Sequence, residues 1–150
     1  MKIIEYSRAH RLSFKKLNEE WLEKYFNVEP YDSTLLENCE SEIINKGGYI
    51  FFGIINNEVM GTYALLPPVN GRTELGKMAV TESYQGKGYG QQLLKHALST
   101  AKSLGIKEIF LFSNRILKNS IYIYKKFGFK EVENVDSPYK RGNIKMLAKL

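Results

Sequence analysis

The sequence contains little cysteine and little histidine, and these two scarcities narrow the chemistry open to it. The single cysteine, Cys39, excludes an internal disulfide and a cysteine-based zinc site, and it favours a reducing compartment. The two histidines, His10 and His96, lie far apart in the sequence. Their separation disfavours both metal catalysis and a histidine-based triad. We therefore expect a protein that needs no metal.

Long hydrophobic runs are also missing. Apolar stretches such as Tyr49–Ile55 fall far short of the ~20 residues that a membrane-spanning helix needs. The N-terminal segment soon becomes charged, with Arg8 and Arg11, and shows none of the apolar core of a signal peptide. We therefore expect a soluble, cytoplasmic protein without a membrane partner.

The remaining composition is that of a globular protein enriched in aromatic residues. Of the 150 positions, 43% are hydrophobic and 25% charged, which allows a core without disulfides. No repeat or flexible linker divides the chain, so we expect one domain over residues 1–150. Lysine and arginine total 22 against 16 acidic residues, and the net charge of +6 is spread along the chain. This excess suits a small polyanionic ligand at least as well as nucleic acid, and we expect no nucleic-acid partner.

Hydrophobic periodicity predicts a mixed α/β domain with elements in the order β-α-α-β-β-β-α-β-α-β-β. The first helix is expected to end by Pro30, and the second to begin near Thr34 in a capping box. The apolar runs 49–55 and 58–66 flank an Asn-Asn turn signal and predict a hairpin. Strand-helix-strand crossovers are expected in the second half of the chain.

The strand predicted over residues 72–80 has an irregular alternation. Leu75 is apolar at an odd position, whereas Met78 and Val80 are apolar at even positions. Such a slip indicates a β-bulge, for which Gly76 is a suitable place, although a strand buried on both faces gives the same pattern. A bulge would re-aim backbone groups toward a ligand.

A glycine-rich loop follows this strand and precedes a helix: residues 85–90 read Gln-Gly-Lys-Gly-Tyr-Gly. Glycines permit close backbone approach, and free N–H groups at a helix N-terminus attract anions. The loop therefore indicates a phosphate or pyrophosphate site, with a flexible turn as the alternative. The Walker motif and the dinucleotide-binding pattern both fail, because Gly88 follows the lysine and Gln91 stands where a glycine is required.

The same loop resembles the Q/R-x-x-G-x-G/A signature of the GNAT-superfamily N-acetyltransferases. Upstream, residues 78–84 are similar to the strand and loop that precede this signature in the family. Downstream, residues 120–129 resemble the family's A-I-x-L-Y-x-K-x-G-F segment, and the order of elements matches along the whole chain. The resemblance implies a GNAT-like mixed central sheet flanked by helices, with acetyl-CoA as the co-substrate.

The resemblance also implies a role for individual residues. Backbone groups of Met78, Ala79 and Val80 would bind the pantetheine arm of acetyl-CoA, and the loop amides would hold its pyrophosphate. The loop residues with this implied role are Gln85, Gly86, Lys87, Gly88, Tyr89 and Gly90. Tyr124 stands where the family often has a catalytic tyrosine, and it would protonate the leaving thiolate. The alternative is that Tyr124 is an aromatic residue of the core.

Two further residues are candidates by position. Some family members carry a catalytic glutamate where this chain has Glu74, but a carboxylate with a pKa near ~4.3 needs burial or a relaying water to act as a base. Otherwise Glu74 merely attracts cationic substrates. The family often has an asparagine seven residues before its tyrosine; here that position is Leu117, and Asn119 is the substitute expected to reach the cofactor.

Together these features predict an acetyl-CoA-dependent N-acetyltransferase that acts by direct attack of a primary amine from a small molecule, peptide or protein. The alternative is a non-catalytic acyl-CoA sensor or interaction module with the same fold. The resemblance implies that the acceptor is chosen by the first two helices and by loops 67–71 and 134–143. A homodimer is compatible with the sequence.

Overall fold

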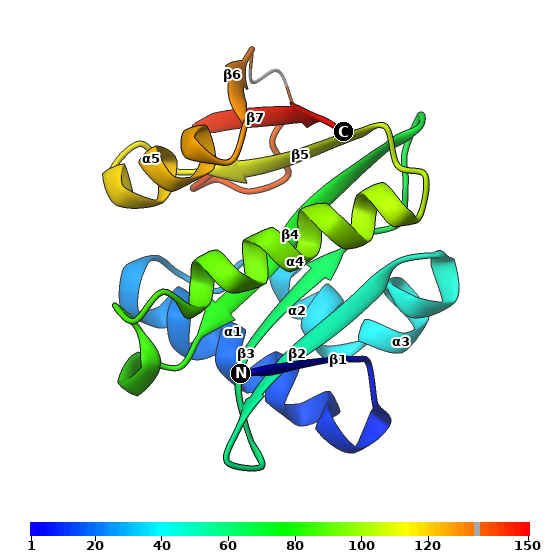
Figure 1. Cartoon of the computed structure of the whole chain (residues 1–150), viewed down its shortest axis with the longest axis vertical. Helices are drawn as coiled ribbons and strands as arrows, with labels where there is room; N and C mark the ends of the chain where they lie inside the picture. Colours follow the sequence, from blue (N-terminus) through cyan, green and yellow to red (C-terminus); the bar gives the residue numbers. More distant parts are fainter. Residues whose placement is uncertain (134–135) are drawn as a thin grey trace.

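The computed structural model describes residues 1–133 and 136–150 and contains one seven-stranded sheet in the order β1-β2-β3-β4-β5-β7-β6 (Figure 1). The strands are β1 (Lys2–Glu5), β2 (Tyr49–Ile55), β3 (Glu58–Leu65), β4 (Arg72–Val80), β5 (Glu108–Ser113), β6 (Lys130–Val132) and β7 (Ile144–Lys149). The helices are α1 (Arg11–Tyr25), α2 (Pro30–Glu37), α3 (Cys39–Glu42), α4 (Tyr89–Ser103) and α5 (Lys118–Lys126), with short 3-10 turns at Arg8–His10, Ile44–Lys46 and Glu82–Tyr84. The predicted fold class and order of long elements are confirmed. No helix of the described residues is long and apolar enough to cross a membrane.

The sheet changes direction between β4 and β5. Neighbouring strands from β1 to β4 are antiparallel, whereas β4 and β5 are parallel. Their pairing covers only residues 72–74 of β4 and 108–110 of β5, after which β5 continues beside β7 alone. Figure 1 shows β5 and β7 turning away from β4. Within the described residues, the second half of β4 therefore has no strand partner on its β5 side.

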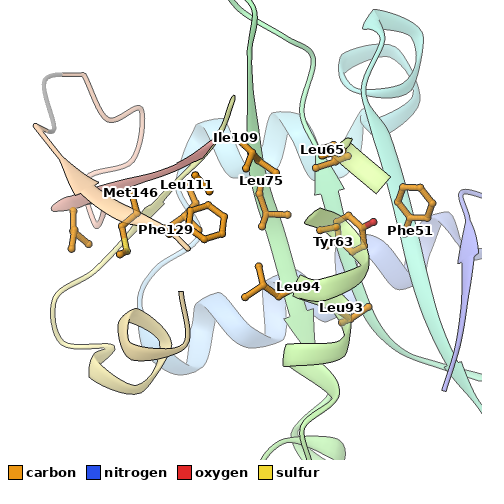
Figure 2. Packing of buried hydrophobic residues seen from close by; sticks show 14 residues of the cluster. Phe51, Tyr63, Leu65, Leu75, Leu93, Leu94, Ile109, Leu111, Phe129 and Met146 are labelled. Carbon is orange, nitrogen blue, oxygen red and sulfur yellow. The ribbon is translucent and has the colours of Figure 1, made fainter. Parts of the chain in front are cut away.

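The two faces of the sheet are covered by different helices. One core lies under α4, where Leu93, Leu94 and neighbouring side chains meet the strands (Figure 2). The other core lies under α1, α2 and α3, around Phe14, Leu36 and Phe52. Both cores consist largely of fully buried aliphatic and aromatic side chains, so the sheet is a rigid platform for residues at its opening.

The hairpin and the bulge predicted from sequence are both present, but the bulge lies beyond Gly76. Gly76 pairs with Ala64 and Ala79 pairs with Thr62, so two residues of β4 face one residue of β3. Lys77, the first of these two β4 residues, has a left-handed backbone with φ of 51°. An L-residue other than glycine adopts this conformation only at a cost of roughly 1–2 kcal/mol. A tertiary contact of Lys77, described below, offsets that cost.

The predicted start of the second helix was wrong. The helix begins at Pro30, where Glu29 is the N-cap residue and forms a capping box with Asp32. Proline at the first helical position needs no hydrogen-bonded N–H, so Pro30 opens this helix instead of only ending the previous one. Thr34 lies inside the helix, and its hydroxyl donates a hydrogen bond to the carbonyl of Pro30.

Candidate active site

A cavity lies at the point where β4 and β5 part. Its walls come from α1, β4, β5, α5 and the loop before β7. The lining side chains include Trp21, Glu74, Met78, Phe112, Tyr124 and Tyr139. Because the parallel pairing of β4 and β5 ends after three residues, the two strands leave an opening beyond that point. The predicted catalytic residues Glu74 and Tyr124 line it.

A groove continues from this cavity to the glycine-rich loop. The residues that line it include Met78, Gly86, Gly88, Gly90, Leu94, Asn119 and Tyr124. Met78, Ser120 and Tyr124 line both the groove and the cavity. A ligand in the groove and a second ligand in the cavity would therefore meet beside these three residues.

The loop has the geometry of an anion site at a helix N-terminus. Gly86 and Gly88 have φ of 76° and 85°, and Gly88 is the N-cap residue of α4. A Cβ atom built on Gly90, which has no such backbone requirement, would meet nothing within 4 Å. Nothing in the described chain therefore demands glycine at position 90, whereas close approach of a ligand to the first turn would.

The other predicted cofactor residues differ in where their side chains lie. Ala79, Val80 and Gln85 line an open extension of the groove, and the Gln85 side-chain amide donates a 2.8 Å hydrogen bond to the Val80 carbonyl. This bond ties the loop to the end of β4. Lys87 and Tyr89 instead contact the ring of Tyr84, at 5.7 Å and 5.9 Å from its centroid. Their side chains are thus engaged within the loop, and their backbone amides remain as the predicted phosphate contacts.

Tyr124 lies on α5 at the junction of the groove and the cavity. Its ring packs edge-on against Phe129, with centroids 5.9 Å apart, while the residue remains partly exposed. Burial of the phenol raises the pKa of Tyr124, so its proton is retained at neutral pH. No hydrogen bond joins the hydroxyl to the described residues. It is a protonated donor facing a cavity, as well as a packing residue.

Glu74 meets the requirement that its sequence position left open. The residue is nearly completely buried on β4, and its Oε2 accepts a 3.0 Å hydrogen bond from the Tyr139 hydroxyl. Burial raises the pKa of Glu74 to about 7, against the opposing effects of that hydrogen bond and the charges of Lys77, Lys145 and Arg141. A carboxyl group with this pKa can accept a proton near neutral pH.

A buried ion cluster beside Glu74 was not predicted from the sequence. Asp32 is 0% exposed and accepts hydrogen bonds from Lys77 Nζ at 2.5 Å and from both terminal nitrogens of Arg141 at 2.7 and 2.8 Å. Burial alone would raise the pKa of Asp32, but these two cations hold it at about 2. Glu29 accepts a further bond from Arg141. The cluster joins α2, the bulge of β4 and the loop before β7.

The segments expected to choose the acceptor are only partly at the cavity. Trp21 of α1 and the loop residues Tyr139 and Arg141 line it. Of the predicted loop 134–143, residues 134 and 135 lie outside the described residues. Pro68 and Gly71 of the other predicted loop line a separate cavity, beside the turn that follows α4. No group of His, Cys, Asp and Glu side chains in the described ranges could hold a metal ion.

Comparisons with known proteins agree with this geometry. The family model described as "Acetyltransferase (GNAT) family" matches residues 13–129. The uncharacterized N-acetyltransferase YvbK of Bacillus subtilis is 30% identical over 116 residues, which cover 75% of this chain and 74% of YvbK. A GNAT family acetyltransferase from Staphylococcus aureus matches with a TM-score of 0.87 and 26% identity, covering 99% of this chain and 98% of its own. A GNAT family acetyltransferase from Elizabethkingia anophelis, solved with acetyl-CoA bound, matches with a TM-score of 0.65 and 25% identity over 99% of this chain and 97% of its own.

Proposed function

Because the chain belongs to the GNAT family of acetyltransferases and is thus an acyltransferase that uses acetyl-CoA, we propose that it moves the acetyl group directly to a primary amine of a small molecule, peptide or protein. The observation that carries the proposal is the junction of groove and cavity at Met78 and Tyr124. A donor in the groove and an amine in the cavity would meet there. The relatives are acetyltransferases, so a non-catalytic sensor is not favoured.

The groove side would hold acetyl-CoA. Loop amides from Gln85 to Gly90, at the N-terminus of α4, would bind the pyrophosphate. Among the described residues, the β4 backbone from Met78 to Val80 has no strand partner toward β5. Gln85 occupies the Val80 carbonyl, and the backbone groups that remain on this side can bind the pantetheine arm. A backbone N–H at the bulge would polarise the thioester carbonyl, where negative charge develops during attack. Asn119, which lines the groove, would contact the same ligand.

The cavity side would supply the base. An alkylammonium ion with a pKa near ~10.4 is only ~0.04% neutral at pH 7, so the acceptor must lose a proton before it attacks. Glu74 lines the cavity, and its pKa of about 7 suits it to take that proton directly or through a water molecule. Burial thus brings the pKa of Glu74 closer to that of the ammonium ion than the pKa of an exposed glutamate would be.

The thiolate that leaves must regain a proton. Tyr124 keeps its proton at neutral pH, and its hydroxyl has no hydrogen-bond partner among the described residues. It lines both the groove and the cavity. Proton donation from Tyr124 would make the thiol a better leaving group, since the thiolate alone has a conjugate acid with a pKa near ~8.5.

The test is to replace Tyr124 with phenylalanine and to measure acetyl transfer to a panel of primary amines by release of free thiol. Tyr124→Phe keeps the ring against Phe129 but removes the proton, so kcat should fall by roughly 10²–10³-fold. Affinity for acetyl-CoA should change little, because the hydroxyl acts on the departing group. Tyr122→Phe is the matched control, since Tyr122 lies on the same helix and is 69% exposed. Full kcat in Tyr124→Phe, where chemistry limits turnover, would leave Tyr124 as a packing residue.

A further inference from the structure

A second tyrosine, Tyr139, touches the proposed base. It lies in the loop before β7, is only 6% exposed, and donates its hydroxyl hydrogen bond to Glu74 Oε2 at 3.0 Å. The other carboxylate oxygen, Oε1, makes no hydrogen bond with the described residues. Tyr139 therefore occupies one oxygen of Glu74 and leaves the second without a hydrogen bond to the described residues, and both side chains line the cavity.

The ring of Tyr139 is itself held by the buried ion cluster. Lys77 Nζ lies 4.6 Å and Arg141 Cζ 4.5 Å from the ring centroid, and both cations bind the fully buried Asp32. The edge of the Phe112 ring meets the same tyrosine, with centroids 6.0 Å apart. Desolvated cations over an aromatic ring attract it strongly, so the ring has little freedom to turn its hydroxyl away from Glu74.

We propose that Tyr139 is a positioning residue of the transfer reaction: its hydroxyl holds the Glu74 carboxylate, and the Asp32 cluster holds its ring in the required place. The inference rests on the proposed role of Glu74 as the base. A buried carboxylate with one fixed hydrogen-bond donor keeps a single orientation, and its charged form is favoured over the neutral acid. Tyr139 would thus set both the direction and the basicity of Glu74.

The charged and titratable groups around Glu74 come from four segments. Lys77 is on the same strand, Lys145 on β7, Arg141 in the loop with Tyr139, and Tyr31 on α2. Burial raises the pKa of Tyr139 well above its usual range, so the phenol stays protonated and remains a donor. Replacing Tyr139 with phenylalanine removes the hydroxyl group and leaves the cations Lys77, Lys145 and Arg141 unchanged. A Tyr139→Phe substitution therefore changes one hydrogen bond and leaves these charges in place.

The experiment measures the titration of Glu74 directly and in catalysis. The ¹³C NMR signal of the Glu74 side-chain carboxyl, assigned with Glu74→Gln, gives its pKa in the wild type and in Tyr139→Phe. The pH profile of kcat/KM is measured in parallel with acetyl-CoA and the most active primary amine of the panel. Tyr31→Phe is the matched control, because the Tyr31 ring packs against Tyr139 at 5.5 Å but donates no hydrogen bond to Glu74 in the described chain.

Tyr139→Phe should raise the Glu74 pKa by about one pH unit and move the acidic limb of kcat/KM upward by the same amount, with recovery at high pH. Tyr31→Phe should move neither. If Tyr139→Phe folds poorly, 3,5-difluorotyrosine at position 139 keeps the shape and strengthens the donor, and it should shift both values downward.

Two failures are distinguishable. If Glu74→Gln keeps full kcat/KM at every pH, Glu74 is not the base, and the inference falls with the proposed mechanism. If Glu74→Gln is impaired but neither Tyr139 variant moves the carboxyl signal or the acidic limb, only the positioning role of Tyr139 is overturned. An equal loss of kcat/KM at all pH values would likewise overturn it, because a merely structural role has that signature.

Discussion

Replacing Asp32 with asparagine should destabilise the protein more than replacing Lys77 with methionine, although both changes break the same ion pair. The asymmetry follows from the burial and the partners of each group. In Lys77→Met, Asp32 keeps both hydrogen bonds from Arg141 and one from the backbone N–H of Glu29. In Asp32→Asn, two cations lose their shared anion, and the Lys77 side chain is only 3% exposed.

The magnitudes can be assigned from these partners. Loss of one charge-assisted hydrogen bond costs about 1.5–3 kcal/mol, and methionine regains part of this through burial of apolar surface. An uncompensated buried charge costs about 3–5 kcal/mol. Methionine and lysine are both unbranched at Cβ, so the left-handed backbone at position 77 adds the same strain to both proteins. Asp32→Asn should therefore be less stable than Lys77→Met, by about 2 kcal/mol at the middle of the two ranges.

Urea denaturation at pH 7 measures both variants, with linear extrapolation to water. Lys46→Met is the matched control, because it breaks the exposed Lys46–Glu42 pair and should cost no more than ~1 kcal/mol. Equal destabilisation of Asp32→Asn and Lys77→Met would refute the reasoning, since it would mean that Arg141 does not support Asp32 once the lysine is gone. A larger loss in Lys77→Met would refute it more strongly.

Two other outcomes follow from the site. Gly90→Asp should weaken coenzyme A binding at least about tenfold in calorimetry, and Gly90→Asn should weaken it less. An acidic residue in the first turn of α4 stabilises the helix, so unfolding would not explain the loss. Unchanged affinity would contradict a phosphate site at the first turn of α4. Burial raises the folded-state pKa of Glu74 to about 7, above its usual value of 4.5. The folded protein therefore holds this proton more tightly than the unfolded chain does, and the contribution of Glu74 to the free energy of unfolding falls as the pH rises from about 4.5 to about 7. Glu74→Gln should remove that loss. The prediction is contradicted if the urea midpoint falls between pH 5 and pH 8 by the same amount in Glu74→Gln as in the wild type.

The parts of the fold that were predictable from sequence are those with a local cause. The hairpin between β2 and β3 turns at Asn56 and Asn57, which have φ of 50° and 63°, and asparagine tolerates that backbone well. The glycine-rich loop was likewise visible, since Gly86 and Gly88 take left-handed conformations that other residues avoid. In both places the residue type is suited to the conformation of its own backbone, so the sequence alone is enough to predict the turn.

The start of α2 shows a local signal with two meanings. Proline stops a helix that precedes it and also opens a helix that follows it, and Pro30 does the second with Glu29 as its cap. Thr34 begins a sequence that has the form of a capping box. In the structure, however, the side chains of Glu29 and Asp32 form the capping box. Residue types alone did not rank these two starts. The earlier start matters, because it brings Asp32 into the first turn of α2, where it faces Lys77.

The surroundings of the proposed catalytic residues were predictable only where they lie on a motif. Tyr124 and Glu74 stand at positions that the family resemblance marks, whereas Tyr139, Asp32 and Arg141 stand in segments without a motif. The hydrogen bonds among them join Glu74 to Tyr139 and Asp32 to Arg141, which are 65 and 109 positions apart in the chain. Side-chain pairs at such separations leave no periodicity in the sequence, so only the fold identifies them.

Lys77 was nevertheless detectable as an anomaly. It is a charged residue between Gly76 and the apolar Met78 in a strand, at the place where the alternation slips. A lysine at such a position either reaches solvent or needs a buried anion, because an unpaired buried ammonium is too costly to persist. With 16 acidic residues in the chain, the sequence could not say which one. The packing of α2 against the bulge selects Asp32, and the same ion pair that offsets the strain at Lys77 also places a cation over the ring of Tyr139. The backbone that is proposed to receive the thioester and the side chain that is proposed to orient the base are therefore fixed by one buried carboxylate.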